Sequence, residues 1–533
     1  MTRKWSRRLS ISLLAAMMLA VMLAGCSGGN RESANPPATS DTNTTTNEDY
    51  GDTGGLKLPL VDKPVELTWM VVSDNTRLND SLVIKEIERR TGIQLNIQAY
   101  PSATYGEKLK AVVASGKLPD LFHGLTMAEI NKMGAQGVLT PINKYLDQLP
   151  NFKQLYVDNP ENNWVMKTYS DDKGNIYPWP MYGVNRDVNH GFLYRKDIFD
   201  KNNIKLWTNT DEFYQALKKL KEIYPNSYPY ASKTKEYIFR DWGYGWGVVN
   251  NEYPAFFDEK THQWKFTFTQ PEYKDMLDFM KKLYNEGLID PEFLTDTEAS
   301  WTSKMTNDKS FVTFDWIGRL DMFYNQVKDN NPNYNLRYGN PVGPSNKIRS
   351  LPKISSYGLV VTNNEKKEAA LKLLDYLSSP SGAELIMLGV KGKSFDIDAN
   401  GKVVYPELKD VPNVDIKMLE EKYGCWVEGM YLRADKRSVY FNFTEKEQEA
   451  QDMMKGKMEP LDPMLKFTDE ENKTKADLYP ELYKAAVEFS TQYVLTKSYG
   501  DKEWQDWLEK AKKLGVDKYI DLYNQAQKRY DAQ

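Results

Sequence analysis

Strand and helix patterns alternate between residues 65 and 122, and this alternation restricts the chain to few fold classes. Residues 65–72 (VELTWMVV) and 93–100 (IQLNIQAY) have the β-branched, aromatic and alternating composition of strands. Between them, apolar residues at helical spacing precede Gly92, a residue that favours the left-handed conformation ending a helix. A second helical stretch and a short strand at residues 118–122 follow. This order predicts a parallel sheet covered by helices.

Helical patterns continue through the rest of the chain, so the predicted fold class is α/β. Apolar side chains recur at helical spacing in residues 211–223, 272–285, 366–377 and 504–514. Their aromatic and Met side chains are expected in a core rather than at a ligand. At roughly 100 to 200 residues per domain, 533 residues suggest two to four domains.

The first 26 residues resemble a bacterial lipoprotein signal. A basic stretch precedes an apolar run from Ile11 to Ala24, which is shorter than the ~20 residues of a membrane-spanning helix. The run ends in Leu-Ala-Gly-Cys, which is similar to a lipobox, where cleavage before Cys26 leaves that cysteine lipidated. An ordinary signal with a chance cysteine is the alternative. We expect removal of residues 1–25 and anchoring through Cys26 at the outer face of a cell membrane.

A polar segment follows the expected anchor. Residues 27–55 are mostly Ser, Gly, Asn, Thr and Asp, a composition that cannot bury enough apolar surface to fold. Residues 26–60 are therefore assigned to the lipidated cysteine and a disordered tether. The net charge of −4 includes four basic leader residues, so the remaining chain is more acidic. An acidic surface repels polyphosphate, and no nucleic-acid partner is expected.

The sequence lacks the motifs of metal sites and of common catalytic sites. His123, His190 and His262 are far apart and have no zinc-binding spacing around them. There is no G-x-S-x-G motif and no P-loop. Cys425 has no evident partner and is interpreted as a bystander. No catalytic residue, metal or cofactor is assigned, although the paired carboxylates of a glycosidase cannot be recognised from sequence alone.

Several short motifs follow one another along the body of the chain. They are GKLPDL at residues 116–121, YRKD at 194–197, TDEFY at 210–214, GLVVT at 358–362 and GVKGKSF at 389–395. Their joint order, with the lipobox and the tether, resembles long extracellular solute-binding lipoproteins of carbohydrate-type ABC importers, similar to alginate-oligosaccharide binding proteins.

This resemblance implies a type 2 periplasmic-binding-protein fold. Two α/β lobes, each a mixed sheet flanked by helices, would enclose a ligand cleft. Lobe 1 would comprise residues 61–178 and 357–415, and lobe 2 residues 179–356 and 416–533. By analogy, the chain would first cross between lobes near residues 177–182 and return near residues 355–358.

One loop departs from the family pattern. Many relatives have a loop of the form DPNGNGKKDE, whose oxygens hold calcium much as an EF-hand loop does. The corresponding residues 224–229 here read YPNSYP. Pro225 and Asn226 remain, but the carboxylates are absent. We expect no calcium at this loop.

Aromatic and polar residues occur together in several loops, as a carbohydrate site requires. Aromatic rings stack on the apolar faces of sugars, and planar polar groups bind sugar hydroxyls. The loop after the first predicted strand is favoured because open α/β sheets bind ligands at the carboxyl ends of strands. The candidate ligand-binding residues are Asp74, Arg77, Trp179, Tyr182, Trp242, Trp246, Asp315, Trp316, Arg319, Tyr357 and Trp426, with Trp179, Trp242 and Trp316 favoured. For any single one, core packing is at least as good an interpretation.

The resemblance implies a receptor rather than an enzyme. It would bind an extracellular oligosaccharide as a monomer, close its lobes and deliver the sugar to ABC permease subunits in the membrane, in a Gram-positive bacterium. Two alternatives fit the residues. One is a surface-anchored polysaccharide hydrolase or lyase. The other is a peptide-binding lipoprotein in which Asp74, Arg77 and Arg319 hold the charged ends of a peptide.

Overall fold

The computed structural model describes residues 48–411 and 413–532. The expected leader, Cys26 and the tether up to residue 47 lie outside the described residues. Residues 50–533 form one compact unit with two large hydrophobic cores. We call the part around Trp69, Trp179 and Trp426 the first lobe, and the part around Trp242 and Trp507 the second lobe. None of the described helices has the length and apolar character of a membrane span.

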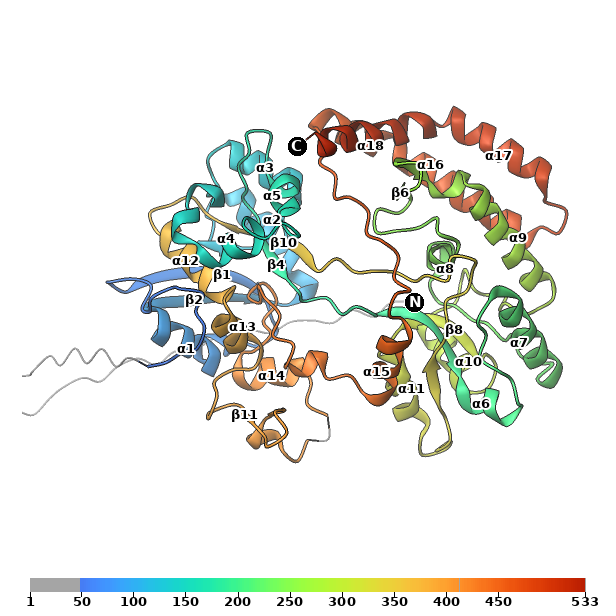
Figure 1. Ribbon diagram of the computed structural model, residues 1–533, viewed down its shortest axis with the longest axis horizontal. Coiled ribbons are helices and arrows are strands. Elements are labelled where there is room, and N and C mark those ends of the chain that lie inside the picture. The colour runs from blue at the N-terminus through green and yellow to red at the C-terminus, as the bar shows by residue number, and fades with distance from the viewer. Residues whose placement is uncertain (1–47, 412, 533) are drawn as a thin grey trace, which may run out of the picture. The chain divides into compact units, whose positions relative to one another are not determined.

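The first lobe contains a five-stranded sheet in the order β2-β1-β3-β10-β4 (Figure 1). Its strands are β1 (Val65–Val72), β2 (Ile93–Tyr100), β3 (Leu121–Phe122), β4 (Trp179–Tyr182) and β10 (Ile354–Val361). Strand β1 pairs parallel with β2 and β3, whereas β10 is antiparallel to β3 and β4. Strands β1 to β4 therefore run in one direction, and their carboxyl ends meet at one edge of the sheet.

Helices cover both faces of this sheet because side chains alternate along β1. Leu67, Trp69 and Val71 belong to the main core, and Met70 belongs to a smaller core on the other face. The main-core side is covered by α1 (Leu82–Thr91), α4 (Pro150–Tyr156), α12 (Lys367–Leu377) and α13 (Pro380–Met387), and the other side by α2 (Ser102–Ser115) and α3 (Met127–Ala135). Gly92 ends α1 at φ 73°, as predicted.

Residues from late in the chain complete the first lobe. In Figure 1 the orange α14 (Ile416–Tyr423) lies with the blue and cyan elements. Leu419, Trp426 and Met430 are buried in the core that holds Trp69. Residues 416–432 therefore pack in the first lobe, which corrects the expected boundary at residue 416. The remaining elements of this lobe are α5 (Trp164–Tyr169), β11 (Asp396–Ile397) and β12 (Val403–Val404).

The second lobe contains a three-stranded sheet in the order β8-β5-β9. The strands β5 (His190–Arg195), β8 (Val312–Trp316) and β9 (Leu336–Tyr338) pair antiparallel. Among the described residues, the strands of this sheet have one parallel contact, a single bridge between Val312 of β8 and Tyr230, which also bridges Ile289. The mixed character expected for this sheet therefore depends on those bridges alone.

Helices and one hairpin surround the second sheet. The hairpin consists of β6 (Ala255–Asp258) and β7 (Gln263–Phe266). The helices are α6 (Lys196–Lys201), α7 (Thr210–Ile223), α8 (Ile238–Trp246), α9 (Pro271–Asn285), α10 (Glu298–Thr306), α11 (Arg319–Val327), α15 (Glu445–Met453), α16 (Asp469–Leu495), α17 (Asp501–Lys513) and α18 (Val516–Asp531).

Three connections join the lobes. A fourth segment, residues 454–468 between α15 and α16, runs beside the second of them. The connections are residues 183–189, 345–353 and 433–444. Tyr182 bonds through its backbone to Leu432 and Ala434, and Gly183 N donates to Lys353 O at 2.7 Å. Ile348 pairs in turn with Lys457 and Glu459 at 2.8 Å. The first crossing therefore begins after β4, and β4 belongs to the first-lobe sheet rather than to lobe 2 as expected.

Candidate functional site

A cavity of about 640 Å³ lies at the carboxyl end of β1. Its wall is formed by residues 72–77, by Val184 and Asn185 of the first connection, by residues of α14, and by residues between 426 and 440. Strand β4 runs in the same direction as β1 and continues into the first connection, so this edge of the sheet is the one from which the chain leaves for the second lobe. Open α/β sheets bind ligands at such an edge.

Aromatic rings form one side of this cavity. Trp426, Tyr431 and Tyr440 line it, and the indole centroid of Trp426 lies 5.2 Å and 5.0 Å from the two tyrosine rings. Trp426 has φ 58°, which is uncommon for a residue with a side chain. Its indole N–H donates to Ser438 Oγ at 2.9 Å. Trp426 itself is only 5 % exposed, so it holds the half-buried rings of Tyr431 and Tyr440 in place, and these two rings offer most of the stacking surface.

Polar side chains also line this cavity. Asp74, Asn75 and Arg77 follow β1, as expected, while Glu420 and Glu421 come from α14. The Ser73 hydroxyl donates to the Glu420 carboxylate, and Asn75 Nδ2 donates to Glu420 O at 3.2 Å. Burial raises the pKa of Glu420, and the negative charges of Asp74 and Glu421 raise it further. Carboxylates and amides with free acceptor positions can bind sugar hydroxyls.

Trp316 is the candidate aromatic residue of the second lobe. It ends β8 and pairs with His190, the first residue of β5. Because β5 follows directly on the connection 183–189, Trp316 lies at the edge of the second sheet where the chain arrives from the first lobe. Its side chain is 39 % exposed, the most of any tryptophan that the structure describes. This exposure leaves a ring face for a ligand.

Asp315 and Arg319 belong to a network of charged side chains next to Trp316. Asp315 Oδ1 accepts from the Trp316 backbone N–H at 2.6 Å. Asp315 also lies 3.1 Å from Lys233 Nζ, and Arg319 Nη2 lies 2.6 Å from Glu298 Oε1. Two cations and two anions therefore neutralise one another in this network. Asp315 and Arg319 thus help to position Trp316, and both stay candidate ligand contacts because Asp315 Oδ2 and Arg319 Nε are buried without a hydrogen-bond partner among the described residues.

Three predicted tryptophans lie in the cores instead. Trp179 and Trp242 are fully buried, and Trp246 is 6 % exposed. Trp179 Nε1 donates to Ser378 Oγ at 3.0 Å, and Trp242 Nε1 donates to the Tyr230 hydroxyl at 2.9 Å. Trp179 and Trp242 have no exposed ring face and a bonded polar atom, so they offer no surface to a ligand, and Trp246 lines neither the cavity at β1 nor the one where the connections pass between the lobes. The expectation for them is corrected to core packing.

Of the two remaining candidates, Tyr182 does not line the cavity. Tyr182 is half-buried on β4 and packs against the first-lobe core. Tyr357 belongs to β10, and its side chain lies outside the described residues.

His190 is a candidate that sequence reasoning missed. Its Nδ1 is buried and has no hydrogen-bond partner among the described residues. Burial and the positive charge of Arg349 lower its pKa to about 4, so the imidazole is neutral at pH 7. A neutral ring nitrogen beside Trp316 can accept a hydrogen bond from a hydroxyl group. A lone histidine offers no sequence signal for this position, because its surroundings are set by the strand pairing.

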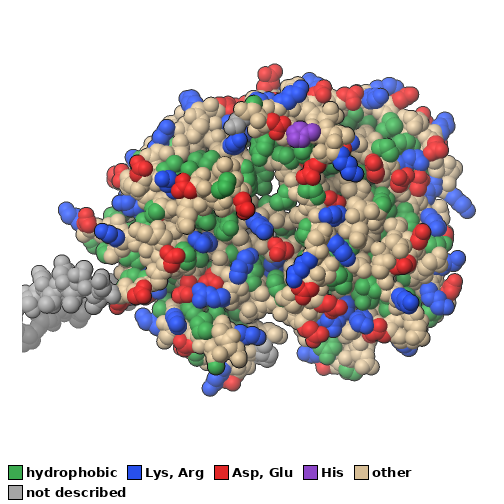
Figure 2. All heavy atoms as spheres, in the orientation of Figure 1, with side chains coloured by type: hydrophobic (Ala, Val, Ile, Leu, Met, Phe, Trp, Pro, Cys, Tyr) green, Lys and Arg blue, Asp and Glu red, His purple; other side chains and the backbone are tan. Residues whose placement is uncertain are grey.

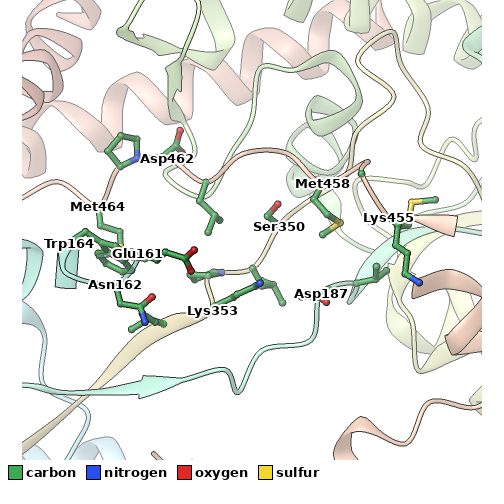
Figure 3. A pocket seen from close by; sticks show the side chains of 18 of the residues that line it. Glu161, Asn162, Trp164, Asp187, Ser350, Lys353, Lys455, Met458, Asp462 and Met464 are labelled. Carbon is green, nitrogen blue, oxygen red and sulfur yellow. The ribbon is translucent and has the colours of Figure 1, made fainter. Parts of the chain in front are cut away.

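A second cavity of about 800 Å³ lies where the connections pass between the lobes (Figure 3). It is lined by Trp164 and Glu161 of the first lobe, by Lys353 of the second connection and by Tyr530 of α18. Thioether and aliphatic side chains contribute much of the rest, namely Met454, Met458, Met464, Leu351 and Leu461. Figure 2 shows a hollow on the drawn face with hydrophobic side chains around it. This lining offers fewer partners for hydroxyl groups than the cavity at β1.

No metal site accompanies either cavity. Within residues 48–411 and 413–532, no three His, Cys, Asp or Glu side chains are placed to hold a metal ion.

Comparison with known proteins decides the family. Residues 80–384 match the family described as bacterial extracellular solute-binding protein. The chain belongs to this family. Proteins of this family bind solutes for transporters, which confirms the expectation of a binding protein rather than an enzyme.

Similar solute-binding proteins cover nearly the whole chain. The fructooligosaccharide ABC transporter substrate-binding protein FusA of Streptococcus pneumoniae is 24% identical, over 92% of this chain and 94% of its own. The polygalacturonan/rhamnogalacturonan-binding protein YtcQ of Bacillus subtilis is 24% identical, over 99% of this chain and 100% of its own. The alginate-binding protein AlgQ2, in a crystal structure without calcium, is 25% identical with a TM-score of 0.65, over 89% of this chain and 99% of its own. The expected solute-binding-protein fold is thereby confirmed.

Proposed function

We propose that this solute-binding protein captures an extracellular oligosaccharide at the cavity beside β1 and delivers it to the permease of an ABC importer. The observation that carries the proposal is the composition of that cavity, which Trp426, Tyr431 and Tyr440 line together with carboxylate and amide groups. Rings and planar polar groups together suit sugar rings and their hydroxyls. The carbohydrates named for FusA and YtcQ support the same ligand class.

The binding residues that we propose come from both lobes. Asp74, Arg77 and Trp426 line the first-lobe cavity, and Trp316 with His190 presents the second-lobe surface. Tyr357 stays a candidate.

Closure of the lobes would transmit binding to the permease. The connection 183–189 leads directly from the cavity wall at Val184 and Asn185 to His190, which is paired with Trp316. A sugar that contacts the rings of the first-lobe cavity and Trp316 together interacts more strongly with a closed arrangement than with an open one. Such differential affinity shifts the population toward closure.

The anchor and the location are part of the proposal. Cys26 would carry the lipid that holds the monomeric protein at the extracellular face of a Gram-positive cell membrane. The lipobox-like residues 23–26 support this, as does the similar lipoprotein LipO of Bacillus subtilis, 24% identical over 74% of each chain. Replacement of Cys26 by serine should release the protein from the membrane fraction. Retention of this variant would contradict the anchor.

A thermal-shift screen tests the proposed ligand class. Oligosaccharides and short peptides are each titrated against the protein without its leader. A ligand that binds only the folded state stabilises it by about 2.7 kcal/mol at one hundred times its Kd. We expect stabilisation by an oligosaccharide, which chromatography then recovers intact. Stabilisation by peptides alone, or turnover of the sugar, would contradict the proposal and favour a peptide receptor or a hydrolase.

A further inference from the structure

Charged side chains are unevenly distributed in the cavity at β1. Four carboxylates line it, and only two cations do. The carboxylates are Asp74, Glu420, Glu421 and Glu428, and the cations are Arg77 and Lys417. The wall that would touch a sugar therefore carries a net negative charge.

Ion pairs within the protein do not neutralise this charge. Among the described residues, none of these six side chains lies within salt-bridge distance of an opposite charge. The closest polar contact of the Glu420 carboxylate is the neutral Ser73 hydroxyl. Burial raises the pKa of Glu420 and of Glu428, and the charge of Lys417 offsets only part of the rise for Glu420.

The second-lobe surface supplies only part of the missing positive charge. Lys233 and Arg319 are occupied by Asp315 and Glu298, as described above. Arg240 lies 2.8 Å from Asp241, whose pKa is raised by burial although the charges of Arg240 and Arg349 oppose this rise. Of these four cations, Arg349 has no salt bridge among the described residues, so this part of the second lobe offers one unpaired positive charge against four carboxylates.

We infer that the sugar rings held in this cavity are uncharged or amine-bearing and that uronate rings are excluded. This rests on the proposed function, because it names the ligand class of the same site. Each uronate ring would bring another carboxylate against the four unpaired ones. A protonated amine at the same place would instead approach Glu420 and Glu421. The similar proteins named for alginate and polygalacturonan would then differ from this chain in the charge of the ligand.

Matched oligosaccharide pairs test this inference. One pair is a mannose oligomer and the mannuronate oligomer of the same length, and another is a galactose oligomer and the galacturonate oligomer. A third pair is a glucosamine trimer and its N-acetylated form. All are placed on one array with other neutral glycans, and every hit is titrated by calorimetry at low and at physiological salt. We expect hits among uncharged or amine-bearing sugars, with any matching uronate bound at least tenfold more weakly.

A charge variant separates electrostatics from shape. The double variant Glu420→Gln, Glu421→Gln should reduce the discrimination against a uronate at least threefold. The control is Glu509→Gln, an exposed position on α17 outside both cavities. If a uronate oligomer binds as tightly as its uncharged partner, or more tightly, this inference is wrong. The proposed function would then still hold, because the protein would still bind an oligosaccharide. An array without any hit would contradict the proposed function itself, and this inference with it.

Discussion

The indole ring of Trp316 lies against Gly318. A methyl group added at Gly318 would be 2.9 Å from three carbon atoms of that ring, closer than carbon atoms in proteins pack. Gly318 has φ −61° and ψ −14°, values that alanine also adopts. The need for glycine at this position therefore comes from the ring and not from the backbone.

Gly318→Ala should weaken sugar binding through Trp316. The added methyl group displaces the indole from its present position, and we expect a three- to tenfold loss of affinity in calorimetry. Unfolding by urea should change by less than about 1 kcal/mol, because an exposed ring can move into solvent. Gln326→Ala, at an exposed position on the following helix, is the control. Unchanged affinity in the glycine variant would show that the indole position does not matter for binding.

Lys304→Met should destabilise the second lobe. Lys304 Nζ lies 2.6 Å from Asp290, 2.6 Å from Glu292 and 2.9 Å from Asp296, and two of these acids are almost fully buried. Removal of the cation leaves buried carboxylates without a partner, which costs about 3 to 5 kcal/mol.

Chemical denaturation measures this loss. Lys502→Met removes a cation from an exposed pair with Asp506 and should cost less than about 1 kcal/mol. Equal effects of the two variants would show that burial of the carboxylates does not govern the energetics of the cluster.

Glu459 should make stability depend on pH. It lies in the segment beside the connections, where burial raises its pKa from 4.5 to about 7. Between these two values the folded protein holds a proton that the unfolded chain has released. The unfolding free energy therefore falls as pH rises from 4.5 to 7, by about 1 to 3 kcal/mol after allowance for solvent screening.

Glu459→Gln removes this titration. We expect the variant to be more stable than the parent at pH 8, and the two proteins to converge near pH 4.5. Denaturation curves at both pH values give the comparison, with Glu509→Gln as an exposed control. The same difference in unfolding free energy between parent and variant at both pH values would contradict the raised pKa.

Removal of divalent cations should leave the protein unchanged. In the loop at residues 224–229, the Lys221 ammonium group donates to Ser227 O at 2.6 Å and lies 4.7 Å above the Tyr228 ring. A cationic side chain thus contacts this loop, and the loop itself has no carboxylate. Addition of EDTA should shift Tm by less than about 1 °C. A calcium-dependent rise in Tm, lost when residues 224–229 are replaced, would contradict this expectation.

Local patterns predicted several helices and strands of both lobes. The bounds of β1 and β2 coincide with residues 65–72 and 93–100, and α9 and α12 differ from their predicted ranges by one residue. The strand predicted at residues 118–122 is shorter, because Asp120 bonds to Thr68 and Asn364 through its side chain. The position of residues 416–432 was not predictable, since it depends on contacts of Trp426 and Leu419 with a core formed early in the chain.

The candidate site was less predictable than the fold. Trp179, Trp242 and Trp316 occur in similar aromatic and polar surroundings along the sequence. What distinguishes them is contact with distant residues, for example the hydrogen bond from Trp179 to Ser378. The loop after β1 was identified because parallel sheets place strand ends together. Glu420 and Glu421 were missed because charged residues on a helix normally face solvent.

Calorimetric titration of one oligosaccharide against two tryptophan variants tests the central claim most directly. Trp316→Ala removes the proposed stacking surface, and Trp164→Ala removes a ring from the second cavity between the connections. The sugar is the one that gives the largest thermal shift. The proposed site predicts at least a tenfold loss of affinity, about 1.4 kcal/mol, for Trp316→Ala at unchanged Tm, and less than a twofold change for Trp164→Ala. Full affinity in Trp316→Ala with a loss in Trp164→Ala would contradict the account and place the ligand in the second cavity.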